Sequence, residues 1–143
     1  MSTRHVAATV LAVVAATGVA GCGNGTSSDG EMKAVLLRGV AEIRGSHYDD
    51  RLRAKLARTL AQLRSVSATT PEARTARRLA IAGFASTISG IESRLAISRN
   101  DSGELAAAAR DTIRAERSLK LGADRLRAAG RALGLHVGSL NGY

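Results

Sequence analysis

The sequence has few of the residue types on which many functional sites depend. Its 143 residues include one cysteine, one proline and no tryptophan, and aromatic residues make up 2% of the chain. A single cysteine excludes an internal disulfide framework and any zinc site built on several thiolates. Pockets for carbohydrates and cofactors commonly recruit aromatic rings, so the scarcity of aromatic residues argues against such a pocket.

The residues that are present describe one small, basic, folded domain. Hydrophobic residues make up 45% of the chain, and 21 lysines and arginines outnumber 12 aspartates and glutamates, for a net charge of +9. This apolar fraction is too high for an obligately disordered chain, and the length leaves room for one domain.

The first 21 residues differ from the rest of the chain. A short positive start with Arg4 precedes the uncharged apolar run Val6–Ala20. As a helix, this run would extend about 22 Å, which is short of the ~30 Å hydrocarbon core of a bilayer. A positive start, a short apolar centre and small residues at the cleavage point are the layout of a secretory signal. We therefore expect residues 1–21 to be a signal peptide, and no later run predicts a membrane span.

The apolar run ends in Val19-Ala20-Gly21-Cys22, an aliphatic residue and two small residues before the cysteine. This box resembles the lipobox of bacterial lipoproteins, with valine where leucine is commoner. The resemblance implies cleavage between Gly21 and Cys22 and a diacylglyceryl group on the Cys22 thiol, and it leaves open whether the new amino group is also acylated, for example by palmitate. Two acyl chains hold a protein stably on a membrane. We therefore expect a lipid anchor at the extracytoplasmic face of the cell membrane.

After the cysteine, the sequence predicts a short tether and an all-α body. Residues 22–30 are rich in glycine and small polar residues, so we expect the lipidated cysteine to continue into a flexible tether. Over residues 31–143 alanine, leucine and arginine dominate, and all three are strong helix formers. Strand-like alternation of polar and apolar residues is absent from this stretch.

The clearest helix is expected to begin at Thr70 and Pro71 and to end near Ser98. Threonine is a good N-cap, and proline fits the first helical turn. The large apolar residues that follow recur at spacings of three and four, which places them on one face. They are Ile81, Phe84, Ile88, Ile91 and Leu95.

Another helix is expected to follow Asp101, which has Glu104 at the spacing of a capping box. Glu116 interrupts the apolar face of this helix. Gly130, Gly134 and Gly138 lower helix propensity, so we expect the helix to fray beyond about Leu135. The residues of the apolar face are Leu105, Ala109, Thr112, Leu119, Ala123, Leu126 and Leu133, with Ile113 beside them.

The segment before Pro71 carries two apolar stripes that do not match. Ile43 in the first stripe and Leu52 in the second would lie on opposite sides of an unbroken helix, at about 100° per residue. We therefore expect a break near residues 45–50, where Ser46 and Asp49 have capping-box spacing. The prediction is an antiparallel three-helix bundle whose first helix is broken and could count as two, with a thin core rich in alanine. The stripes are Leu36, Val40 and Ile43, and Leu52, Leu56, Leu60 and Leu63.

Patterns for catalysis and metal binding are missing from the sequence. The three histidines have no partner at metal-ligand spacing, and no Glu-x-x-His is present. His47, Asp49 and Asp50 cluster at the expected break, where turn and cap residues are the better interpretation. We therefore expect a protein that is not an enzyme and holds no metal or cofactor.

The remaining signal is positive charge arranged in groups. Arg110, Arg114 and Arg117 share one helix face, opposite the apolar face just described. The other groups are Arg74, Arg77 and Arg78, and Arg51, Arg53, Lys55 and Arg58.

Such groups are either ordinary solvated helix faces or polyanion contacts. We expect no nucleic-acid partner, because an exported protein seldom meets one and few aromatic rings are available for base stacking. Anionic lipid headgroups and cell-wall polymers are nearer, and basic residues close to an anionic surface contribute around 1 kcal/mol each.

Three functional hypotheses follow. The first is a non-catalytic lipoprotein whose helical body binds another envelope protein or itself. The alternative is an electrostatic module that binds anionic lipid or wall polymer. An enzyme whose site is assembled only by tertiary structure is the third and weakest.

Overall fold

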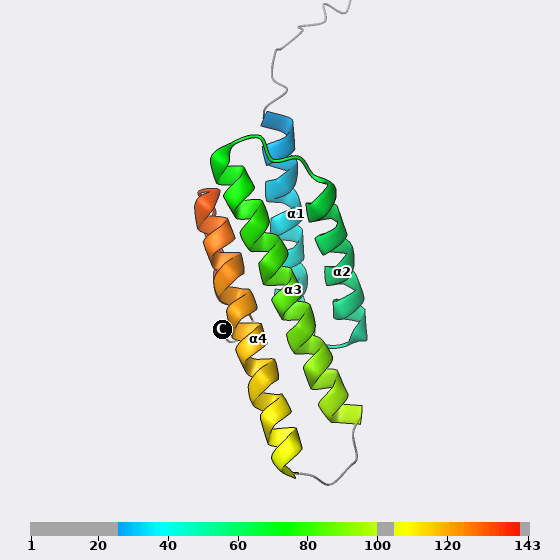
Figure 1. Ribbon diagram of the computed structural model, residues 1–143. Helices are drawn as coiled ribbons and strands as arrows, with labels where there is room; N and C mark the ends of the chain where they lie inside the picture. The colour runs from blue at the N-terminus through cyan, green and yellow to red at the C-terminus, as the bar shows by residue number, and fades with distance from the viewer. Residues whose placement is uncertain (1–25, 100–104, 141–143) are drawn as a thin grey trace, which may run out of the picture.

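The computed structural model describes residues 26–99 and 105–140, and in these ranges it is all-helical, with no strand. The four helices run alternately in opposite directions (Figure 1). They are α1 (Thr26–Gly45), α2 (Asp50–Ser65), α3 (Pro71–Arg99) and α4 (Leu105–Ala132). The expected signal peptide, Cys22 and the Asp101–Glu104 capping box lie outside the described residues.

The expected break in the first helical segment is confirmed, and it changes the helix count. The chain leaves α1 at Gly45 and begins α2 at Asp50. The two stripes belong to separate antiparallel helices, so the three-helix prediction is corrected to four. Every residue of both stripes is buried, because the reversal turns the two faces toward one core. The N-cap of α2 is Asp49, not Ser46, and its side chain accepts a hydrogen bond from the Leu52 amide at 2.7 Å.

Replacing this cap tests how much the turn contributes to stability. Asp49→Ala leaves the Leu52 amide without its side-chain acceptor, and we expect it to lower the free energy of unfolding by about 1 kcal/mol. Asp49→Asn caps almost as well and should retain most of the stability. Urea denaturation followed by circular dichroism measures both. Equal losses for the two variants would show that the side-chain charge, and not the capping bond, stabilises the turn.

Helix α1 begins earlier than the sequence predicts. Its first residue is Thr26, so Thr26–Gly30, expected to be tether, are helical. Asp29 lies in this first turn and accepts hydrogen bonds from the loop before α3: 2.9 Å from the Thr70 hydroxyl, 3.2 Å from the Thr69 hydroxyl and 3.3 Å from the Thr69 amide. Tertiary contact thus extends a helix into a stretch whose composition favours a loop.

Ionisation strengthens this contact. Desolvation raises the pKa of Asp29, and the hydrogen bonds from Thr70 and Thr69 lower it by more, so the pKa lies below its ordinary value of 3.8. The contribution to stability is therefore present above that value and is lost as the pH falls through the lowered pKa.

The core forms where α1, α2 and α3 meet. Phe84 of α3 is fully buried, and Gly39 of α1 and Thr59 of α2 are buried beside it. A Cβ atom at Gly39 would lie 2.7 Å from Phe84 Cε1 and 2.8 Å from Thr59 Cγ2, so only glycine fits there. The expected seam of α3 is confirmed: Phe84 and Ile91 are buried, while Ile81, Ile88 and Leu95 are partly buried against the core.

Helices α3 and α4 form a long hairpin that extends beyond the ends of α1 and α2 (Figure 1). Small residues allow the two backbones to approach closely. A Cβ atom at Gly122 would lie 3.0 Å from the Gly83 carbonyl oxygen, and one at Gly90 would lie 2.7 Å from Leu119 Cγ.

The C-terminal tail is packed against the bundle rather than frayed, which corrects the sequence prediction. Helix α4 ends at Ala132, and Gly134 takes a positive φ of 68°. The Leu135 amide then donates to the Gly130 carbonyl at 2.9 Å, which closes the helix in a Schellman motif.

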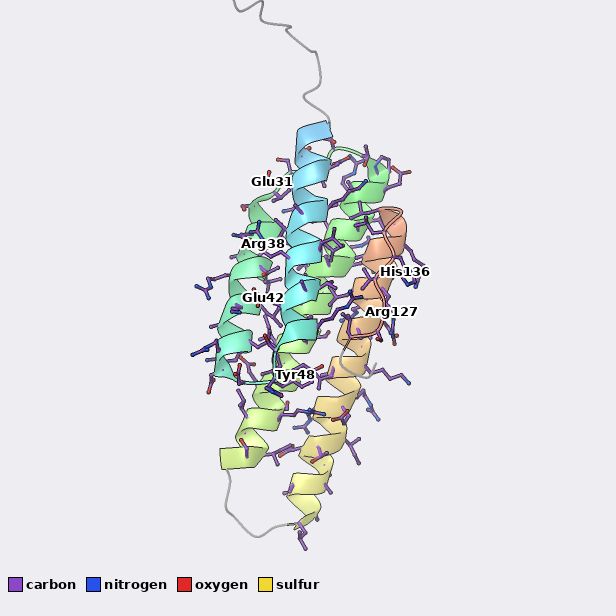
Figure 2. All side chains as sticks on the ribbon, turned by 180° about the vertical axis from the view of Figure 1, so that it is seen from behind. Glu31, Arg38, Glu42, Tyr48, Arg127 and His136 are labelled. Atoms are coloured by element: carbon purple, nitrogen blue, oxygen red, sulfur yellow. The ribbon has the colours of Figure 1, made fainter. Side chains whose placement is uncertain are left out.

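Beyond this motif the tail runs back beside α4, where His136 marks its path (Figure 2). Val137 and Leu140 are buried in the core. Arg44, near the end of α1, donates from Nε to the Ser139 carbonyl at 3.2 Å. The glycines that end the helix therefore allow the chain to turn back and add two side chains to a core short of large residues.

Candidate functional site

The predicted arginine row of α4 lies on an exposed surface. Arg110, Arg114 and Arg117 are all exposed and occupy successive turns of one helix. Arg110 donates from Nε to the Ala106 carbonyl at 3.2 Å, and Arg114 pairs with Asp111 at 3.1 Å. Both contacts are local to α4, so the guanidinium groups remain at the surface and are able to contact an anion.

The apolar face predicted for α4 is buried only in its second half. Leu119, Ala123 and Leu126 lie in the core, as expected. Leu105 is 86% exposed and Ile113 is 60% exposed, which contradicts the prediction for the first half. These residues lie in the part of the hairpin that α1 and α2 do not reach (Figure 1). Periodicity shows which residues share a face, but not where a neighbouring helix ends.

Glu116, which interrupts the predicted face, has a partner on the other arm of the hairpin. Its Oε1 pairs with Nη2 of Arg94 on α3. Arg94 also lies over Tyr48, with 5.1 Å from the guanidinium carbon to the ring centroid. The charge within the apolar pattern therefore links α4, α3 and the turn between α1 and α2.

The second predicted group, at the start of α3, has a largely structural arrangement. Arg77 donates from Nε to the Leu63 carbonyl at 2.8 Å and from Nη2 to the Arg64 carbonyl, so it binds the last carbonyls of α2. Arg74 donates to the Thr69 carbonyl at 2.8 Å. Arg78 is exposed. Together with Ile81, the three arginines line an open cleft of about 380 Å³.

A second open cleft lies at the turn between α1 and α2, near Tyr48 in Figure 2. Its volume is about 540 Å³. Sequence reasoning identified the turn as solvated but missed Arg94, which comes from α3, far away in the sequence. Residues with positive charge and hydrogen-bond donors dominate the lining, which favours a small anion over an apolar ligand. The lining residues are Arg44, Gly45, Ser46, His47, Tyr48 and Arg94.

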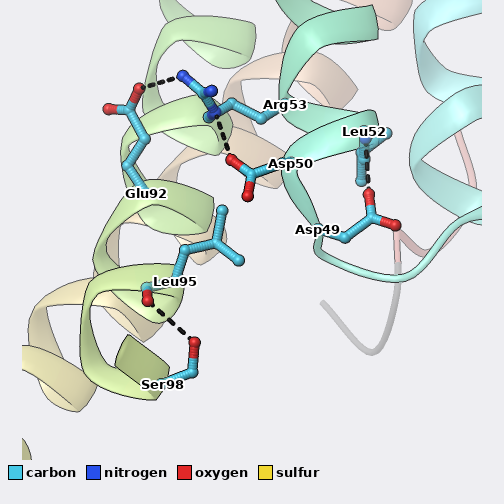
Figure 3. Close-up of polar contacts among 7 residues, drawn as sticks. All are labelled: Asp49, Asp50, Leu52, Arg53, Glu92, Leu95 and Ser98. Carbon is cyan, nitrogen blue, oxygen red and sulfur yellow. Dashed lines mark hydrogen bonds and ion pairs between the residues drawn. The ribbon is translucent and has the colours of Figure 1, made fainter. Parts of the chain in front are cut away.

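The acidic residues beside this turn serve to connect α2 with α3 (Figure 3). Arg53 lies 3.3 Å from Asp50 through Nε and 3.6 Å from Glu92 through Nη1. All three side chains are roughly half exposed, and ion pairs at such positions contribute less than about 1 kcal/mol. Asp49 caps α2, as described above. Of the predicted cluster, Asp49 is thus a cap, Asp50 is an ion-pair partner, and His47 lines the open cleft.

Within residues 26–99 and 105–140, no group of three or more histidine, cysteine, aspartate or glutamate side chains is placed to hold a metal ion. Among the same residues, no helix combines the length and the hydropathy needed to cross a bilayer. Comparison of the chain with protein-family models, with curated proteins and with solved structures finds no match in any of the three.

Proposed function

We propose that this protein is a lipoprotein of the bacterial cell envelope. In this proposal Cys22 carries a diacylglyceryl group after cleavage behind Gly21, and the helical body is a non-catalytic interaction module at the extracytoplasmic face of the membrane. The observation that carries the proposal is the box Val19-Ala20-Gly21-Cys22 at the end of an apolar run too short to span a bilayer.

The start of α1 supports a close attachment. Only residues 23–25 separate Cys22 from Thr26, the first residue of the helix. Three residues extend about 10 Å at most. A lipid on Cys22 would therefore hold the N-terminal end of α1 near the headgroups, and the bundle would lie within reach of membrane-bound partners.

The surface of the body favours binding over catalysis. Three ionisable residues beside the two clefts have structural roles: Asp49 caps a helix, Arg77 binds a backbone carbonyl and Arg94 forms an ion pair. Leu105 and Ile113, by contrast, expose large apolar side chains on the projecting hairpin. In the leading proposal, the helical body binds another envelope protein or a second copy of the chain. The alternative is a module that binds anionic lipid or wall polymer, and the arginine row of α4 favours it.

Intact-mass analysis of the membrane-extracted protein tests the anchor. We expect a mature chain that begins at Cys22 and is heavier than its sequence by a diacylglyceryl group, with or without a further acyl chain. Chemical crosslinking of the same membranes tests the interaction module, and we expect a discrete adduct with an envelope protein or a second copy.

Two results would contradict these proposals separately. A soluble product that retains residues 1–21 and an unmodified thiol would remove the anchor. A lipidated protein that forms no adduct at native expression would leave the anchor in place and remove the leading partner.

A further inference from the structure

The first two-thirds of α4 carry a surface on which basic and aliphatic side chains are mixed. Ile113 is 60% exposed and Leu121 is 43% exposed, and four exposed bases share this side of the helix with them. At about 100° per residue, the whole set falls within an arc of about 120°. We call this surface the α4 outer face. It consists of Arg110, Ile113, Arg114, Arg117, Lys120 and Leu121.

The position of α4 in the fold leaves this face open. Helix α4 packs chiefly against α3, and it forms one edge of the bundle (Figure 1). Its buried residues, such as Ala115, Leu119 and Leu126, point toward α3 and the core. The α4 outer face lies on the opposite side of the helix, along the projecting hairpin and the lower part of the bundle.

The charge on this face is positive and only partly compensated. Among the described residues, Arg117 and Lys120 form no ion pair, and Arg114 pairs with Asp111 on its own helix. Glu116, the other acid in this stretch, is turned toward Arg94 on α3. Asp124, beyond Leu121, pairs with Arg127 at 2.6 Å. Glu116 and Asp124 therefore have partners outside this face, and Asp111 offsets part of the charge of Arg114. The remaining bases, Arg110, Arg117 and Lys120, leave the face with a net positive charge.

Basic residues alone would fit any polyanion, but the aliphatic residues among them favour an anionic partner that also has an apolar layer. Single exposed apolar side chains are common on soluble proteins. A helix face that combines leucine or isoleucine with a row of arginine and lysine is typical of helices that lie in the interface of a bilayer. A wall polymer offers phosphate groups and no apolar layer to receive Ile113 and Leu121.

We propose that the α4 outer face binds the surface of an anionic bilayer. Its bases contact lipid phosphates, and Ile113 and Leu121 enter the headgroup region. The inference deepens the proposed function and rests on it for the placement of the body next to a membrane. It adds an orientation, since the lipid anchor at the start of α1 and the α4 outer face are two separate attachments.

Vesicle binding tests this proposal without the anchor. The protein is a chain that begins at residue 22 with Cys22→Ser, which retains every described residue. We expect it to bind vesicles that contain phosphatidylglycerol at low salt and to dissociate from them at about 0.5 M salt. It should not bind vesicles of phosphatidylcholine alone. Co-sedimentation measures the partition coefficient.

Matched variants locate the binding surface. Arg110→Gln, Arg114→Gln and Arg117→Gln together should lower the partition coefficient on the order of 100-fold. The control triple Lys33→Gln, Arg38→Gln and Arg131→Gln removes the same charge from exposed positions outside the predicted basic groups. It should lower the partition coefficient by less than about 10-fold. Ile113→Ser with Leu121→Ser removes no charge and should cost about 10-fold. Circular dichroism verifies that each variant keeps its helices.

Each remaining outcome would overturn the inference. Equal losses for the two charge triples would mean that net charge, and not this face, attracts the membrane. Binding to teichoic acid without binding to vesicles would assign the face to wall polymer. If the protein bound no vesicles but formed a dimer that Ile113→Ser with Leu121→Ser dissociates, the α4 outer face would instead bind a second copy of the chain. In all three cases the mass of the native protein still reports independently on the anchor.

Discussion

Replacement of Cys22 with alanine is expected to abolish lipidation completely, because the sequence contains one cysteine and no other thiol can substitute for it. The product should be either a precursor that retains residues 1–21 or a cleaved chain released from the membrane. Two acyl chains hold a protein stably because each buried methylene contributes about 0.8 kcal/mol, so their loss should shift the cleaved chain from the membrane to the soluble fraction. Membrane fractionation with intact-mass analysis measures both results.

A neighbouring substitution serves as the control for this experiment. Gly25→Ala leaves the thiol and the box Val19–Cys22 intact, so it should keep the mass and the membrane partition of the native protein. If Cys22→Ala also left both properties unchanged, the resemblance to a lipoprotein would be wrong and the proposed location would fall with it.

The second large effect is expected at the junction of α1, α2 and α3. Gly39→Ala places a methyl group against the Phe84 ring and the Thr59 methyl group, both of them buried. Extra methyl groups in a packed core typically cost 1–3 kcal/mol. For a chain of this size we expect a fall in Tm of roughly 5–10 °C, which differential scanning calorimetry measures.

The same helix supplies a matched control. Gly30→Ala makes the same chemical change in α1, but no atom lies within 4 Å of the added Cβ. Because alanine favours helix by about 1 kcal/mol over glycine, Gly30→Ala should stabilise the protein. Phe84→Leu, combined with Gly39→Ala, should recover part of the lost stability by making room. Equal effects of Gly39→Ala and Gly30→Ala would show that the junction is not close-packed.

Local signals were enough to predict the helices and most of the core. The two stripes before α3 are buried, and the seam of α3 is buried or partly buried against the core, since apolar spacing determines which residues share a face. The mismatch between Ile43 and Leu52 also predicted the reversal between α1 and α2. At Thr70 and Pro71 the start of α3 follows the cap chemistry, and the Thr70 hydroxyl accepts from the Ala73 amide at 3.2 Å.

The errors occur where distant segments meet. The helical first turn at Asp29 depends on Thr69 and Thr70, about forty positions away along the chain. The packed tail depends on Arg44. Local helix propensity does not reveal contacts between distant segments. The sequence therefore predicted a loop at Thr26–Gly30 and fraying at the C-terminus, although tertiary contacts order both segments.

The candidate site was predicted in the same incomplete way. The arginine row of α4 could be predicted from helical spacing, but Leu105 was assigned to the apolar face and Ile113 was placed beside it. Both are exposed. The exposure of Leu105 follows from the lengths of the helices, because α3 and α4 continue past the ends of α1 and α2 (Figure 1). The carbonyl contacts of Arg77 require the chain reversal between α2 and α3, and spacing within one helix does not reveal it.

The bonds of Asp29 have a mechanical consequence. Tension applied to the N-terminal end of the chain enters the bundle through the first turn of α1, where Asp29 is bound to Thr69 and Thr70 at the start of α3. The load is thereby shared between two helices instead of peeling one turn at a time from α1. A force that would unfold an isolated helix one turn at a time must here break several hydrogen bonds together. The N-terminal end of the bundle is therefore reinforced against tension.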